Sequence, residues 1–156
     1  MIEATFSAAS LAAVVAWAGL GIAVLVPNGR LRASLLAFGG RVVPVGLCVL
    51  YTYLLITHWG SAPGGGFSSL AAVLALFSAP GKMLGGWVHF LAFDLLVGRW
   101  LVDDALASRR SRLILLIPLP VTFMYGPLGL LLYVLARSAP LLAARGEALK
   151  ARLHGG

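Results

Sequence analysis

Three ionisable side chains occur at intervals of five residues within one apolar stretch of the sequence. His89, Asp94 and Arg99 lie in GGWVHFLAFDLLVGRW, residues 85–100, which is long and apolar enough to cross a bilayer. An aspartate at mid-membrane costs about 2.5–3.5 kcal/mol if it faces lipid, so we expect Asp94 to face inward and to find partners. A carboxyl and an imidazole can supply the proton transfers of general acid–base catalysis. We therefore predict catalytic roles for Asp94 and His89.

Donor side chains are predicted at the same depth in the neighbouring apolar segments. Tyr51 lies near the middle of the second segment and Tyr125 at the middle of the fourth, so either hydroxyl could reach Asp94. Tyr125 is therefore predicted to complete the catalytic group. The alternative is that these side chains only pack, and that Arg99 only anchors the helix at the headgroups. The predicted substrate contacts are Trp17, Tyr51, Trp87, Phe90, Phe93 and Arg99.

The composition of the chain is that of an integral membrane protein. Hydrophobic residues make up 60% of the 156 residues and charged residues 11%, whereas soluble domains have about a quarter charged residues. Residues 4–29, 42–81 and 113–136 contain no Lys, Arg, Asp or Glu, which leaves no polar face for water. The net charge of +7 comes from cations at the ends of these apolar runs. This placement indicates contact with lipid headgroups and argues against nucleic-acid binding.

The apolar segments predict one all-α transmembrane domain over residues 1–156. A helix of about 20 residues crosses a bilayer, and four segments approach that length. Residues 67–79, between the second and third segments, are too short to cross comfortably and predict an interfacial or re-entrant helix. We therefore expect a bundle of four transmembrane helices, over residues 6–26, 42–58, 84–102 and 113–136.

Prolines and cations refine this expectation. Pro118, Pro120 and Pro127 each lack a backbone donor, so the fourth span should be kinked or partly unwound. The tail, residues 140–156, has the pattern of a basic amphipathic helix on the headgroups. Cations are slightly more numerous on the side of the first and third connectors, which favours both termini outside the cytoplasm. We expect contacts with membrane lipids, and association with other membrane proteins or a second copy is open.

The sequence has no motif for a metal or a nucleotide cofactor. HExxH, GxSxG and P-loop patterns do not occur, and no spacing of His and Cys is typical of a metal site. No cofactor and no metal site are therefore predicted. One alternative is kept: His58 and His89 are expected on the same side of the membrane and could both ligate haem.

Three segments together resemble a known family. They are FSSLAAVLALF, GGWVHFLAFDLLVGRW and YGPLGLLLYVLAR, which span about residues 67–137. Their order and spacing are similar to the small integral-membrane family named for the plant abscisic-acid-deficient-four protein, which is required for neoxanthin synthesis. Phe90 stands where that family has a tyrosine. The matching positions are Gly86, Trp87, His89, Phe90, Leu91, Ala92, Phe93, Asp94, Leu95, Gly98, Trp100, Gly126, Pro127, Leu128, Gly129, Leu130, Leu131 and Arg137.

The resemblance implies a carotenoid or related isoprenoid as the ligand. It implies an isomerase-type rearrangement, either epoxide to allene or cis/trans, in which Asp94 is the acid, His89 the base, and Tyr125 or Tyr51 orients Asp94. The alternative is a pigment-binding or structural subunit without catalysis. The first span begins almost at the first residue, so we expect a bacterial member in the inner membrane, without a transit peptide.

Overall fold

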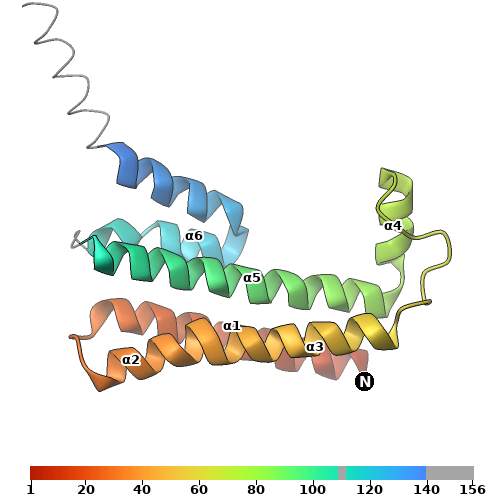
Figure 1. Ribbon diagram of the computed structural model, residues 1–156, viewed down its shortest axis with the longest axis horizontal. Helices are drawn as coiled ribbons and strands as arrows, with labels where there is room; N and C mark the ends of the chain where they lie inside the picture. Colours follow the sequence, from red (N-terminus) through yellow and green to blue (C-terminus); the bar gives the residue numbers. More distant parts are fainter. Residues whose placement is uncertain (109–111, 140–156) are drawn as a thin grey trace, which may run out of the picture. The chain divides into compact units, whose positions relative to one another are not determined.

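The computed structural model describes residues 1–108 and 112–139, and every regular element within these ranges is a helix (Figure 1). The all-helical prediction is therefore confirmed. The chain forms two compact units, residues 1–100 and residues 101–156, which we describe separately. The predicted amphipathic tail, residues 140–156, lies outside the described residues.

Two long apolar helical segments open the first unit. Helix α1 spans Ile2–Leu25, and the next segment runs without a break from Arg30 to Thr57. This second segment consists of α2 (Arg30–Ala37), the π-helix η1 (Phe38–Val42) and α3 (Val43–Thr57). It packs along α1 (Figure 1). Both segments are long and apolar enough to cross a membrane.

The helical second segment begins at Arg30, twelve residues before the start of the span predicted from residue 42. The sequence placed the arginines before residue 42 in a connector because cations avoid lipid. In the structure Arg32 is buried, and its guanidinium donates a hydrogen bond to the Val26 carbonyl at the end of α1. That bond satisfies one of the hydrogen-bond donors of the buried guanidinium. The helix can therefore include Arg32, although cations were expected to lie before its start.

The π-helix brings two glycines into tight contacts. A Cβ on Gly39 would come within 2.6 Å of the Ala16 carbonyl oxygen, which belongs to the α1 backbone. A Cβ on Gly40 would meet the Arg99 side chain, whose guanidinium donates a hydrogen bond to the Leu36 carbonyl. Small residues of this kind let membrane helices approach closely. The wider π turn therefore lies where the second segment comes close to both α1 and the Arg99 side chain.

We expect Gly39→Ala to lower the free energy of unfolding by about 1–3 kcal/mol, because the added methyl group meets a backbone atom that cannot rotate away. Thermal unfolding in mild detergent measures the change. Gly46→Ala in α3 is the matched control, since a Cβ there meets nothing within 4 Å. The control should gain up to about 1 kcal/mol, because alanine favours a helix over glycine. Equal changes in the two variants would contradict close packing at Gly39.

A short helix, α4 (Leu70–Ser78), precedes the long helix α5 (Pro80–Ala107) and makes an angle of 102° with it. The Ser69 hydroxyl caps α4 by accepting a hydrogen bond from the Ala72 N–H at 3.2 Å. Pro80 then begins the new direction, because it cannot continue the hydrogen-bond ladder of α4. The structure thus contains the short, separate helix expected near residues 67–79.

The second unit contains the broken helix that the prolines predicted. Its parts are η2 (Arg112–Leu115), α6 (Pro118–Tyr125) and a helix over Pro127–Ala139. The break falls at Gly126, whose φ of 45° suits glycine because it has no Cβ. Neither α6 nor the following helix is long enough to cross a membrane alone. Two helices, or three if α4 and α5 form one span, have the length and composition to cross, so the four predicted spans are not confirmed.

A polar cluster that the sequence did not predict stabilises the second unit. The buried Tyr133 hydroxyl donates a hydrogen bond of 2.6 Å to Asp104 Oδ2, and Arg137 Nε lies 3.1 Å from the same oxygen. Hydrogen bonds to a charged group contribute about 1.5–3 kcal/mol. The cluster connects the end of α5 to the last described helix.

We expect Tyr133→Phe to lower the free energy of unfolding by about 1.5–3 kcal/mol, because the phenyl ring keeps the packing but leaves Asp104 without its hydroxyl donor. Thermal unfolding in mild detergent again measures it. Tyr53→Phe is the control, since Tyr53 is 59% exposed and its change should be close to zero. A Tyr133 variant as stable as the control would show that the bond contributes nothing.

Candidate functional site

One side of α5 packs against α1. The Trp87 indole N–H donates a hydrogen bond of 3.0 Å to the Ser10 hydroxyl, and a Cβ on Gly98 would come within 2.4 Å of the Trp17 ring. Residue numbers rise together along both helices between these contacts, so α1 and α5 run parallel. Asp94 lies between Trp87 and Gly98 at helical spacing and therefore belongs to the same side.

Asp94 is buried, as predicted, with 8% of its surface exposed. The prediction that it finds hydrogen-bonding partners is wrong for one of its oxygens: no described residue bonds to Oδ2, which is fully buried. The reason is that the side chains expected to donate a hydrogen bond to Asp94 lie elsewhere. Tyr51 contacts a different side of α5, the Trp17 ring lies against Gly98, and Tyr125 is 64% exposed.

The opposite side of α5 carries His89. The His89 ring lies 5.5 Å from the Tyr51 ring between centroids, at an angle of 59°, and it stacks on Phe93 at 4.5 Å and 21°. His89 and Asp94 are five residues apart, which places them roughly 140° apart around the helix. This rotation explains why one is buried against α1 and the other is exposed.

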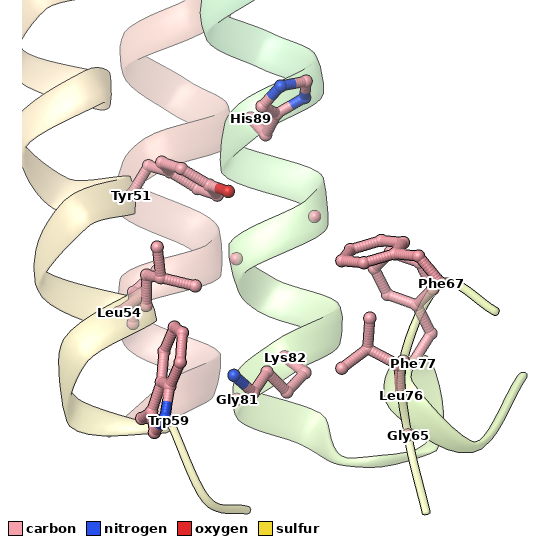
Figure 2. A pocket seen from close by; sticks show the side chains of 14 residues that line it. Tyr51, Leu54, Trp59, Gly65, Phe67, Leu76, Phe77, Gly81, Lys82 and His89 are labelled. Carbon is pink, nitrogen blue, oxygen red and sulfur yellow. The ribbon is translucent and has the colours of Figure 1, made fainter. Parts of the chain in front are cut away.

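A cavity of ≈ 440 Å³ lies within the first unit, between the end of α3, the following loop, α4 and the start of α5. Figure 2 shows Tyr51 extending from α3 toward α5, with Trp59 and Lys82 at the other end of the cavity from His89. The walls are mainly apolar, as is typical of small-molecule sites. The lining residues are Tyr51, Leu54, Leu55, Trp59, Gly65, Gly66, Phe67, Leu76, Phe77, Gly81, Lys82, Gly85, Gly86 and His89.

Glycines shape the cavity in two ways. A Cβ on Gly81 would come within 2.0 Å of the His58 ring, and one on Gly86 within 2.6 Å of Phe77, so these glycines let the loop and α4 approach α5. Gly85 differs, because it is buried yet a Cβ there would meet nothing within 4 Å. The open space beside Gly85 belongs to the cavity.

Two of the predicted site residues, Tyr51 and His89, line the cavity together. Among the others in the first unit, Arg99 is half-buried and bonds to the Leu36 carbonyl, while Phe90 and Phe93 are 37% and 53% exposed. Tyr125 belongs to the second unit. Two of the remaining predicted residues, Trp87 and Asp94, lie on the side of α5 that packs against α1. The third, Trp17, belongs to α1 and contacts that side at Gly98.

The sequence did not predict the end of the cavity that lies away from His89. Trp59, Phe77 and Lys82 line the cavity, although the sequence predicted no role in a site for any of them. Gly81, Gly85 and Gly86 line the cavity too, and their recurrence at i, i+4 and i+5 on one helix is a sequence signal for space or close approach. The Lys82 ammonium lies 5.4 Å from the centre of the Trp59 ring, a cation–π contact.

The haem alternative involved His58 and His89. His58 Nδ1 lies 3.1 Å from the Leu54 carbonyl oxygen and 3.0 Å from the Thr57 hydroxyl, both on its own helix. Within residues 1–108 and 112–139, no group of three or more His, Cys, Asp or Glu side chains is arranged to hold a metal ion.

Long apolar helices with an apolar cavity beside them place this chain among the small helical membrane proteins. A comparison with protein-family models narrows that class. The chain belongs to the ABA DEFICIENT 4-like family, whose model matches residues 4–133, so the match includes α1, which the resemblance from the sequence did not cover. This family is linked to the biosynthesis of carotenoids and xanthophylls, neoxanthin among them. Neither the curated proteins nor the solved structures gave a significant match to the chain.

Proposed function

We propose that this protein isomerises a carotenoid or related isoprenoid within the membrane, and that the reacting part of the substrate occupies the cavity of the first unit. The observation that carries the proposal is the Tyr51–His89 pair, 5.5 Å apart, in the wall of an apolar cavity. Family membership supplies the substrate class. A hydroxyl and an imidazole beside one bound molecule can give and take protons.

The proposed rearrangement converts an epoxide into an allenic alcohol without any other reactant. His89 removes a proton from a chain carbon, the electrons of that C–H bond form a new C=C bond, and the epoxide C–O bond breaks. The epoxide oxygen takes the Tyr51 proton, and His89 then returns a proton to Tyr51. The substrate neither gains nor loses atoms or electrons, so the step is an isomerisation. A cis/trans isomerisation of the polyene could use the same pair.

The acid in this scheme is Tyr51 and not Asp94, the residue that the sequence suggested. Asp94 does not line the cavity, whereas the Tyr51 side chain extends into it (Figure 2). A general acid must come within hydrogen-bond reach of the atom that it protonates. The acid role of Asp94 stays a prediction, and the variants Asp94→Leu and Asp94→Asn test it.

Expression of the full chain in a bacterial host that accumulates an epoxy-carotenoid tests the function. We expect a product of unchanged mass with the altered absorption of an allene or a cis polyene, resolved by liquid chromatography with mass spectrometry. The same host without the gene is the control. A purified protein that holds pigment in stoichiometric amount but never changes it would contradict the proposal and favour a pigment-binding subunit.

A further inference from the structure

The cavity continues onto an exposed apolar stripe of α5. Phe93, Leu96 and Trp100 follow His89 at i+4, i+7 and i+11, which places all four on one side of the helix. The three are 53%, 41% and 45% exposed. Because the His89 ring both lines the cavity and stacks on Phe93, the stripe begins where the cavity ends.

The cavity is too small for a whole carotenoid. An apolar cavity of about 150 Å³ takes one benzene molecule, so ≈ 440 Å³ takes about 18 carbon atoms, fewer than half of the roughly forty in a carotenoid. One ring and the first part of the chain fit, and the rest must lie outside. From Lys82 to Trp100 the helix rises about 27 Å, close to the thickness of the hydrocarbon core.

The end of the cavity away from His89 carries a cation. Lys82 makes no ion pair with any residue in the described part of the chain, and its contact is with the face of Trp59. An ammonium group has three donors and no acceptor, so it is suited to bind an oxygen atom of a ligand. His89 is seven positions further along α5, a rise of about 10.5 Å, so Lys82 and His89 lie at separate ends of the cavity.

We propose that the cavity binds one cyclic, oxygen-bearing end group with its oxygen at Lys82, and that the polyene leaves past His89 along Phe93, Leu96 and Trp100. This inference rests on the proposed function, because it names the part of the substrate that the same site recognises. The two polar ends of the cavity then have separate tasks: Lys82 holds the end group, while Tyr51 meets the epoxide oxygen and His89 the reacting carbon.

Titration of the purified full chain in detergent tests the recognition of the end group. The probes are zeaxanthin, whose rings carry hydroxyls, β-carotene, whose rings do not, and lycopene, which has no rings; quenching of tryptophan fluorescence reports binding. We expect zeaxanthin to bind about tenfold more tightly than β-carotene, the effect of one hydrogen bond to a charged group, and lycopene to bind more weakly still. Equal affinities for the three probes would overturn the proposal.

Two glycine variants test the position of the ring. Gly85→Leu fills the open space of the cavity and should weaken zeaxanthin binding by at least about tenfold, while Gly85→Ala should weaken it less. Gly46→Leu is the matched control, since Gly46 is exposed on α3 and a Cβ there also meets nothing within 4 Å. Binding by Gly85→Leu as tight as by the control, at equal thermal stability, would overturn the proposal.

Lys82→Met and Phe93→Ala separate the two halves of the ligand. Lys82→Met keeps the apolar stem, so it should remove the preference for zeaxanthin over β-carotene. Phe93→Ala should weaken zeaxanthin but not the short probe 3-hydroxy-β-ionone, which has the ring and no polyene. A loss for both probes in Phe93→Ala, or an unchanged preference in Lys82→Met, would contradict the proposed orientation.

The binding measurements and the conversion assay can contradict the inference and the proposed function independently of each other. Ring-specific binding that depends on Gly85 and Lys82, in a protein that forms no product, would support the inference and contradict the isomerase. Turnover that depends on His89 but is unaffected by Gly85→Leu would support the isomerase and contradict the inference.

Discussion

Replacing His89 with alanine should reduce carotenoid conversion by about 10²–10⁴-fold, because the change removes the base in the proposed proton transfer. His89 is exposed and its ring contacts Tyr51 and Phe93, so its loss leaves no buried partner without a bond. Thermal unfolding should therefore change little. Product formed per amount of purified protein, in the host that accumulates epoxy-carotenoid, gives the measurement.

Two tyrosines of α3 provide a matched comparison for the other half of the pair. Tyr51→Phe removes the proposed acid and should reduce conversion by a factor similar to that of His89→Ala, whereas Tyr53→Phe should have no effect. Tyr51 lines the cavity, while Tyr53 is 59% exposed and does not line it. Full conversion by the Tyr51 variant would exclude its hydroxyl as the acid.

Asp94→Leu should raise the free energy of unfolding by about 1–3 kcal/mol, because a buried carboxyl oxygen without a hydrogen-bonding partner among the described residues destabilises the fold. Leucine is similar in size and matches the apolar neighbours on α1. Asp94→Asn is the control, since the amide has nearly the same shape and stays polar, so it should recover less stability. A Leu variant less stable than the wild type would show that Asp94 has a partner or a bound group.

The same two variants decide which group acts as the acid. With Tyr51 as the acid, both Asp94 variants should keep their conversion of the carotenoid. A loss of conversion in Asp94→Asn, at unchanged stability, would return the acid role to Asp94. Such a loss would also show that the protein keeps the Asp94 carboxyl for its function although this group destabilises the fold, as is common for ionisable groups in membrane segments.

The sequence by itself determined the class of fold and several local features. Long runs without charge predicted apolar helices because the hydrocarbon core excludes charged groups, and the prolines predicted the break that the structure has at Gly126. The burial of Asp94 also followed from the cost of exposing it to lipid. Each of these features depends only on the residues of one segment and on the lipid or water around it, so the sequence of that segment is enough to predict it.

The tertiary structure alone decided which side chains meet. Tyr51 was expected beside Asp94 but contacts His89, because the rotation of α3 and α5 about their axes is set by close packing and not by depth in the membrane. Arg32 is buried near the start of the second segment, where its guanidinium donates a hydrogen bond to the Val26 carbonyl at the end of α1. The cavity, with Lys82 and Trp59 at one end, depends on glycines that admit neighbouring segments at some positions and leave space at Gly85. Contacts of this kind join residues far apart in the chain, and no periodicity within one helix specifies them.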